Sequence, residues 1–265
     1  MSEIIPIKPI SFACPKCKRP LHSGENALQC GECNRTYLIE EGIPDFLSGD
    51  AQASLVLQMA KKVDFLAPIY ESRLWYSILL KLAGAGGSSI VSIASFHSEN
   101  LKGITGSVLD VACGTATYGR RIASPSKSVY GIDISLGMLQ QGMAYVERDG
   151  VPGVHLARAR VEELPFENAV FDGAICSGSL HLFPDTALAL GEIARTMKAG
   201  APLTVQTFVA GNTSINRLLK RRPDIHTFEL PELQQYLSEA GFERFESKMS
   251  GIVLTFGARK AVPLT

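Results

Sequence analysis

The segment from Ser107 to Asp133 constrains the fold of this chain more than any other. Ser107–Ala112 is a short run typical of a buried strand, and Cys113–Gly119 follows it as a turn of small residues that opens a helix. A second strand, Ser128–Asp133, ends in an acidic residue 23 positions after Asp110. This order of strand, small-residue loop, helix and strand predicts an α/β sheet that binds a ligand at the carboxyl ends of its strands.

The two acidic residues of this segment indicate the kind of ligand. Small residues let the backbone approach a ligand closely, and the following helix directs its amino end at a carboxylate. Asp110 offers an acceptor to an ammonium group, and Asp133 stands where a carboxylate accepts both hydroxyls of a ribose. These groups together describe S-adenosylmethionine. A loop that binds NAD reads GxGxxG without a preceding acid, because pyrophosphate repels a carboxylate.

Four of the six cysteines form two CxxC pairs near the N-terminus, with twelve residues between the pairs: Cys14 and Cys17, then Cys30 and Cys33. Two tight turns at this spacing present four thiolates to one tetrahedral zinc ion. Lys18 and Asn34, just after the pairs, suit a backbone that curls around a metal. Four cysteine ligands leave no open coordination position, so we predict a structural zinc ion.

Helical patterns occur between the cysteines and the first strand, and again near the C-terminus. Apolar residues recur at helical spacing over 51–82, with a break at Pro68, and an amphipathic piece follows at Ile90–Leu101. Near the C-terminus, Phe228–Gly241 predicts a helix, and 242–259 predicts a hairpin that closes the sheet. A cluster of three aromatic residues either packs in a core or lines a substrate site: Tyr70, Trp75 and Tyr76.

Four segments match, in order, the successive motifs of class I S-adenosylmethionine-dependent methyltransferases: LDVACGTATYGRRIA, VYGIDISLGML, VEELPFENAVFDGAICSGSLHLFPD and EIARTMKAGAPLTVQTF. They resemble the ubiquinone/menaquinone-type branch most. The leader CPKCKRPLHSGENALQCGECNRTYLIEEGIPDFL resembles zinc ribbons that precede some methyltransferases, and small zinc-ribbon proteins that activate methyltransferases as separate subunits. The resemblance implies a Rossmann-like α/β fold, with a seven-stranded sheet and helices on both faces. It also implies a zinc ribbon (11–48), a helical cap or lead-in (49–106) and a methyltransferase domain (107–265).

The resemblance also implies a cofactor site built from Asp110, Ala112, Cys113, Gly114, Thr115, Ala116, Asp133, Ile134, Met138, Arg160, Val161, Glu162, Cys176 and Ser177. The chain departs from the family pattern at two of these positions. Ala116 stands where the loop usually has its second glycine, and its small side chain preserves the close approach of the backbone. Arg160 stands where an Asp usually accepts from the adenine amino group, so it either stacks on adenine or points to solvent. Val161 still offers its backbone N–H to the base.

The acceptor side is expected just after a fourth strand at Phe171–Ser177, because the end of this strand borders the transferred methyl group in this fold. His181 is the candidate general base, or it shapes the cofactor site. Methyl transfer from a sulfonium needs alignment and desolvation more than a base. Cys176 lies in a buried strand, which disfavours a nucleophilic thiolate. The remaining histidines show no metal spacing, so no second metal site is expected: His22, His97, His155 and His226.

The chain has 26 basic and 26 acidic residues, so no overall field draws it to nucleic acid or to an acidic membrane. The lack of a long apolar run and of a signal-like start predicts a soluble, cytoplasmic protein. We expect O- or C-methylation of a small or lipophilic acceptor. One alternative is rRNA or tRNA methylation guided by basic residues of the ribbon: Lys8, Lys16, Lys18 and Arg19. The other is a methyltransferase-like binding protein that has lost adenine recognition at Arg160.

Overall fold

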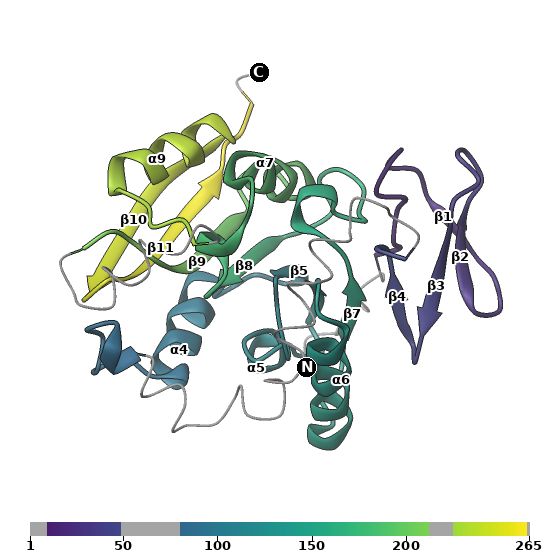
Figure 1. The fold of residues 1–265 in the computed structure, drawn as a ribbon, viewed down its shortest axis with the longest axis horizontal. Helices are drawn as coiled ribbons and strands as arrows, with labels where there is room; N and C mark the ends of the chain where they lie inside the picture. Colours follow the sequence, from purple (N-terminus) through teal and green to yellow (C-terminus); the bar gives the residue numbers. More distant parts are fainter. Residues whose placement is uncertain (1–9, 49–79, 212–224, 264–265) are drawn as a thin grey trace.

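An eleven-stranded sheet runs through the molecule, in the order β1-β2-β3-β4-β7-β6-β5-β8-β9-β11-β10. The structure is a computed structural model that describes residues 10–48, 80–211 and 225–263 (Figure 1). The strands are β1 (Leu21–Ser23), β2 (Ala27–Cys30), β3 (Thr36–Glu40), β4 (Ile43–Asp45), β5 (Gly106–Val111), β6 (Lys127–Asp133), β7 (Val154–Arg158), β8 (Gly173–Ser177), β9 (Pro202–Phe208), β10 (Phe242–Ser250) and β11 (Val253–Lys260). The helices are α4 (Ile90–Asn100), α5 (Gly119–Ile122), α6 (Leu136–Asp149), α7 (Thr186–Thr196) and α9 (Leu230–Glu239), with short 3-10 turns η1 (Val161–Glu163) and η2 (Leu180–Leu182).

The five central strands β7, β6, β5, β8 and β9 are parallel. Figure 1 shows α4, α5 and α6 on one side of the sheet and α7 and α9 on the other. Strands covered on both faces are mostly apolar, and Val108, Leu109 and Val111 of β5 are fully buried. The chain changes direction of winding between β5 and β8, and ligands bind at the carboxyl ends of strands at such a point.

The C-terminal hairpin closes this sheet as predicted. β10 and β11 pair antiparallel, and β11 pairs antiparallel with β9. α9 ends before Gly241, whose φ of +80° suits a glycine after a helix. β5 to β11 are the seven strands of the expected Rossmann-like α/β sheet, and that fold class is confirmed.

The ribbon does not stand apart from this sheet. β4 pairs in parallel with β7 through Asp45 and Arg158, so the four ribbon strands extend the central sheet at one edge. β3 and β4 are joined by Glu41 and Gly42, both with positive φ, as in a tight two-residue hairpin turn. The side chain of Ile43 is buried among residues of α6 and β7. The ribbon and the larger domain therefore share one hydrophobic core.

An aromatic chain joins the two parts of that core. The ring centroid of Phe46, just after β4, lies 5.0 Å from that of Tyr37 in β3 and 5.5 Å from that of Phe12. Phe12 in turn lies 5.5 Å from Phe166, which packs on Phe171 at 4.8 Å. Aromatic pairs at these separations add about 0.5–1.5 kcal/mol each beyond the area they bury.

The helical lead-in is described only from residue 80. A helix ends there at a left-handed Gly84, where the helical spacing of the sequence also ends, with bonds from Gly84 N to Lys81 O and from Ala85 N to Leu80 O. The amphipathic piece at 90–101 forms α4, with Ser89 as its N-cap. The expected helices over 51–79 lie outside the described residues, as do Tyr70, Trp75 and Tyr76.

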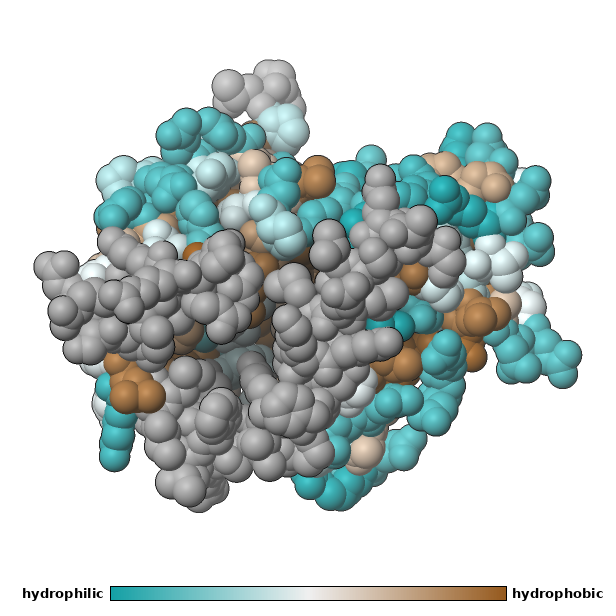
Figure 2. All heavy atoms as spheres, in the orientation of Figure 1, coloured by the Kyte–Doolittle hydropathy of each residue, from teal (hydrophilic) through white to brown (hydrophobic). Residues whose placement is uncertain are grey.

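The surface is mixed in character. On the face shown in Figure 2, hydrophilic side chains cover α9 and much of the ribbon, and hydrophobic side chains show in separate patches between and below them. Within the described ranges, no helix combines the length and apolarity that a membrane span requires.

Candidate cofactor and metal sites

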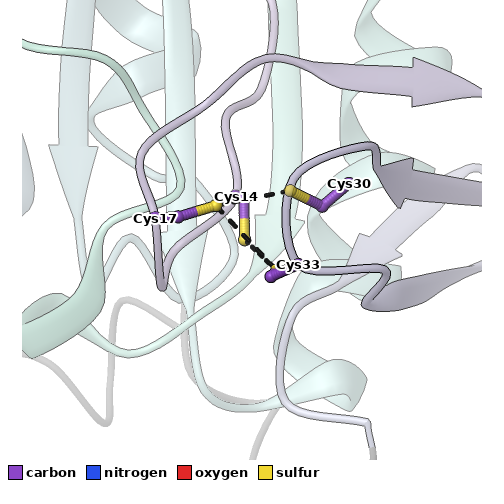
Figure 3. Close-up of side chains that lie close together, drawn as sticks. All are labelled: Cys14, Cys17, Cys30 and Cys33. Carbon is purple, nitrogen blue, oxygen red and sulfur yellow. Dashed lines mark hydrogen bonds between the residues drawn. The ribbon is translucent and has the colours of Figure 1, made fainter.

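Each CxxC pair forms the same backbone turn. Lys18 N donates to Cys14 O at 2.8 Å, and Asn34 N donates to Cys30 O at 2.9 Å. Both donors are left-handed, with φ of 57° at Lys18 and 56° at Asn34. The two turns face each other, and Figure 3 shows the four cysteine side chains pointing toward a common centre.

The four sulfur atoms fit a zinc ion. They all lie within 4.8 Å of one another, and none forms a disulfide. Cys17 Sγ is 3.3 Å from Cys30 Sγ, and Cys14 Sγ is 3.6 Å from Cys33 Sγ. A tetrahedron with zinc–sulfur bonds of about 2.3 Å has edges of about 3.8 Å, so a zinc ion needs only small shifts. Among the described residues, no other cluster of three or more potential ligands occurs.

Tyr37 supports this metal set from outside. Its hydroxyl lies 3.2 Å from Cys14 Sγ and can donate to a thiolate. Burial acts to raise the pKa of Cys14, but the hydrogen bonds from Tyr37 and from the amides of Cys17 and Lys16 lower it to about 6. Donors around a ligating sulfur stabilise the charged form that a metal needs.

The loop between β5 and α5 has the tight backbone that its sequence predicts. Ala112, Gly114 and Ala116 have φ of 49°, 56° and 55°, a left-handed region in which alanine is strained. Arg120 of α5 braces the loop, since its Nε donates to Thr115 O at 3.3 Å while its Nη1 lies 3.0 Å from Asp149 Oδ2. Three small or compact loop residues are thus held close to the end of β5.

Two carboxylates flank this loop. Asp133, at the end of β6, accepts from Gly114 N and Ser135 N, both at 2.8 Å, and so ties the loop to the start of α6. A carboxylate has about four acceptor positions, which lets Asp133 fix these loops and also accept ribose hydroxyls. Asp110 is buried and accepts from Gly119 N at 3.0 Å. Burial, with a contribution from the charge of Asp133, raises the pKa of Asp110 to about 7, against the lowering effect of the Gly119 bond.

The remaining residues of the loop and of α6 pack behind these acids. Cys113 is so close to β6 that a Cβ on Gly131 would lie 2.8 Å from its Sγ. Thr115 is buried, with its Oγ1 3.0 Å from that of Thr117. Met138, in the first turn of α6, is buried and donates its amide to the N-cap Ser135 at 3.1 Å.

Arg160, Val161 and Glu162 lie after β7, at the turn η1. Arg160 Nη2 is 3.0 Å from Glu163 Oε2, so its guanidinium is held by an acid of its own turn rather than left in solvent. Val161 is buried. Burial raises the pKa of Glu162. Sequence reasoning considered stacking or solvent for Arg160 and did not consider this local ion pair.

The end of β8 carries the acceptor-side residues. Cys176 is buried, and burial raises its pKa to about 12, which keeps the thiol protonated. Ser177 Oγ lies 3.0 Å from Nε2 of His97, whose Nδ1 lies 3.0 Å from Thr204 Oγ1. His181 is also buried, with Nδ1 3.2 Å from Thr207 Oγ1, and burial lowers its pKa to about 4.

His97 is a residue that sequence reasoning assigned only to surface or core. It projects from α4 to the end of β8, a contact between segments that no local pattern relates. Burial lowers its pKa to about 3, and its ring meets Tyr118 of the β5–α5 loop at 5.1 Å. The sequence signal that could have identified His97 is its place as a polar residue at a core position of an amphipathic helix.

Two family models match parts of this chain. Residues 108–200, which run from β5 to just before β9, match the family described as methyltransferase domain. Residues 12–42 match the family described as Trm112p-like protein. The chain carries a class I S-adenosylmethionine-dependent methyltransferase domain. Its four-cysteine ribbon corresponds to the Trm112p-like segment.

Relatives of the methyltransferase domain agree. A protein of Arabidopsis thaliana described as an uncharacterized chloroplastic methyltransferase is 25% identical over 94% of this chain and 78% of its own. A demethylmenaquinone methyltransferase of Corynebacterium kroppenstedtii is 38% identical over 38% of this chain, and the match spans only 41% of that enzyme. Phosphoethanolamine N-methyltransferase 2 of Haemonchus contortus, solved with S-adenosylmethionine, shares the fold with a TM-score of 0.60 and 16% identity, over 75% of this chain and 60% of that one.

The methyltransferase domain brings most of the predicted cofactor residues to one edge. The bond from Gly114 to Asp133 joins the β5 and β6 ends, and Arg158 Nε donates to Ile134 O at 3.0 Å, which joins the β6 end to the β7 end. Cys176 and Ser177 are the last residues of β8, which pairs with β5 on its other side. The predicted substrate-side aromatic residues fall outside the described part of the chain.

Proposed function

We propose that this methyltransferase transfers the methyl group of S-adenosylmethionine to an oxygen or carbon atom of a small or lipophilic acceptor. The observation that carries the proposal is the character of the β8 end. From Cys176 to Leu182 no side chain has a fixed charge, and burial lowers the pKa of His181 to about 4. The segment from Cys176 to Leu182 therefore offers no charge to hold a phosphate or a cation, and it suits a neutral acceptor.

The proposal assigns each part of S-adenosylmethionine to particular residues. Asp133 accepts the ribose hydroxyls, Asp110 faces the ammonium side, and the backbone at 112–116 lies against the methionine part. Val161 offers its N–H to adenine, with Ile134, Met138, Arg160 and Glu162 around the base. S-adenosylmethionine supplies a methyl group on a positively charged sulfonium, so the protein needs mainly to align the acceptor and exclude water.

His181 has a limited role in this proposal. Its imidazole is neutral at physiological pH, so it can accept a hydrogen bond or a proton. A base with so low a pKa removes protons poorly. The hydrogen bond between His181 and Thr207 holds the imidazole ring in one orientation. We propose that it orients the acceptor side and contributes little proton transfer.

The relatives support a quinone-like acceptor. The demethylmenaquinone methyltransferase likeness extends over 105 residues and favours a ring hydroxyl or an activated ring carbon as the methyl acceptor. The neutral net charge of the chain agrees with such an acceptor, because an uncharged quinone does not need an electrostatic field of the protein to attract it.

Ion pairs in the structure involve two of the basic residues on which the RNA alternative depends. Two of the four cations that it invokes are paired with acids: Lys16 Nζ is 2.6 Å from Glu163, and Lys18 Nζ is 2.8 Å from Glu192. Paired in this way, they contribute little to a phosphate-binding face. Lys8 lies outside the described residues.

An acceptor screen with labelled S-adenosylmethionine tests the proposal. Demethylated naphthoquinols and simple phenols form one set, and total rRNA and tRNA form the other. We expect label in the first set and none in RNA. Labelled RNA would overturn the proposal, and the absence of S-adenosylhomocysteine binding by calorimetry would favour the non-enzymatic alternative.

A further inference from the structure

The zinc ribbon contacts both ends of the segment that we assign to adenine. That segment runs from Arg158, the last residue of β7, through η1 to Pro165. At its start, Phe46 N donates to Arg158 O at 2.8 Å; at its end, Ala13 N donates to Pro165 O at 2.8 Å. The ribbon thus fixes where the segment begins and ends.

Charged side chains reinforce the end of the segment. Lys16 lies inside the first CxxC pair and its Nζ is 2.6 Å from Glu163 Oε1. The other oxygen of Glu163 is 3.0 Å from Nη2 of Arg160. Glu163 therefore connects a lysine of the metal turn to a residue of the proposed adenine site.

Lys18 makes a second link from the same metal turn. Its Nζ lies 2.8 Å from Glu192 Oε2 and 3.3 Å from the carbonyl of Leu164. The amide of Leu164 donates to the same Glu192 oxygen at 3.0 Å. The backbone immediately after η1 is held on both its polar groups.

A third link reaches the ribose side. Asp45 of β4 lies 3.1 Å from Arg158 Nη1, and Arg158 Nε donates to Ile134 O at 3.0 Å. Ile134 follows the proposed ribose acceptor Asp133. Both Asp45 and Arg158 are largely buried, so this pair is poorly screened by solvent.

We propose that Lys16 and Asp45 are positioning residues for S-adenosylmethionine, through which the metal-bound ribbon holds the adenine side of the site. The inference rests on the cofactor site proposed above. Lys16 keeps its place only while Cys14 and Cys17 hold the metal, so the metal and the cofactor bind cooperatively although they do not touch. Coupling of this kind is reciprocal: the cofactor raises zinc affinity by the same factor as zinc raises cofactor affinity.

The expected effect of one link is modest. The Lys16 and Glu163 side chains are about one-third exposed, and pairs of this kind contribute little in isolation. We expect Lys16→Met to weaken S-adenosylhomocysteine binding about two- to five-fold. Asp45→Asn should have a larger effect, because it leaves Arg158 without its buried acid.

The test measures S-adenosylhomocysteine affinity by calorimetry on the full zinc-loaded chain. Lys102→Met is the matched control, since Lys102 forms an exposed pair with Glu99 at 3.3 Å, far in sequence from the ribbon. Lys16→Arg tests rescue by a residue that keeps the charge. We expect weaker binding for Lys16→Met, and wild-type binding for Lys16→Arg and Lys102→Met.

A second readout is zinc release to a chromophoric chelator, with and without S-adenosylhomocysteine. We expect the ligand to retain zinc in the wild type and to retain it less in Lys16→Met. Unchanged affinity of Lys16→Met, or equal weakening of Lys16→Arg, would overturn the inference. Asp133→Ala separates the two proposals: if it also binds normally, the cofactor site itself is wrongly assigned.

Discussion

Asp133 joins two loops and faces the proposed ribose position, so its carboxylate has both a structural and a binding role. We expect Asp133→Ala to weaken S-adenosylhomocysteine binding by about 1–3 kcal/mol, because the ribose loses a charged acceptor. Calorimetry measures the loss, and thermal unfolding of the same variant reports how much comes from the freed loops. Affinity within error of the wild type would move the ribose site elsewhere.

Ala112 shows how a residue type can oppose its backbone. With φ at 49°, it occupies a region that costs an alanine about 1 kcal/mol or more. We expect Ala112→Gly to keep the free energy of unfolding or to raise it by up to about 1 kcal/mol, because strain relief offsets the entropy of glycine. Ala144→Gly, at an exposed position inside α6, is the control and should lower it by about 1 kcal/mol. Urea unfolding checks both, and a large loss at position 112 would contradict the strain argument.

At the scale of elements, the ribbon is the clearest case of metal-dependent structure. We expect purified protein to hold about one zinc ion per chain, and Cys14→Ser to lose the metal together with the order of β1 to β4. Since β4 pairs with β7, amide exchange should also rise in β7. Metal analysis with hydrogen exchange checks this. Protected ribbon amides in a metal-free protein would contradict it.

Local patterns predicted most elements, and long-range contacts escaped them. The β5 to β6 segment, the terminal hairpin and the cysteine set carry strong local signals, such as the acid at Asp133 and the CxxC spacing. The pairing of Asp45 with Arg158, and the reach of His97 to Ser177, depend on how distant segments pack. Asp45 lies in the leader motif and His97 lies in the amphipathic pattern at 90–101, but neither pattern identifies the distant residue that each one contacts.

At the scale of the whole molecule, two buried histidines make stability depend on pH. Burial lowers the pKa of His97 from 6.5 to about 3 and that of His181 from 6.5 to about 4. The unfolded chain therefore binds more protons below pH 6.5. The contribution of these two histidines to stability is full above that pH and falls on acidification, by up to about 1.4 kcal/mol per pH unit for each histidine. Asp110, whose pKa is raised to about 7, contributes with the opposite sign.

The measurement is urea unfolding between pH 5 and 7 for the wild type and for His97→Gln and His181→Gln, which cannot titrate. We expect each variant to be less stable than the wild type at pH 7 but to lose less stability on acidification. Comparison within the set removes the contribution of zinc release, which all three share. Equal pH slopes in all three proteins would show that these histidines are not neutralised by the fold.

The pairing of β4 with β7 also means that β4 stays unpaired for part of translation. Asp45 and Arg158 are 113 residues apart in the chain. A ribosome that adds about 5–20 residues per second needs roughly 6–23 s to make that stretch. Throughout this interval the finished ribbon presents an unpaired strand edge and the uncovered side chain of Ile43. The nascent chain can aggregate through this edge until β7 has been synthesised. Early zinc binding would keep the ribbon folded during that interval.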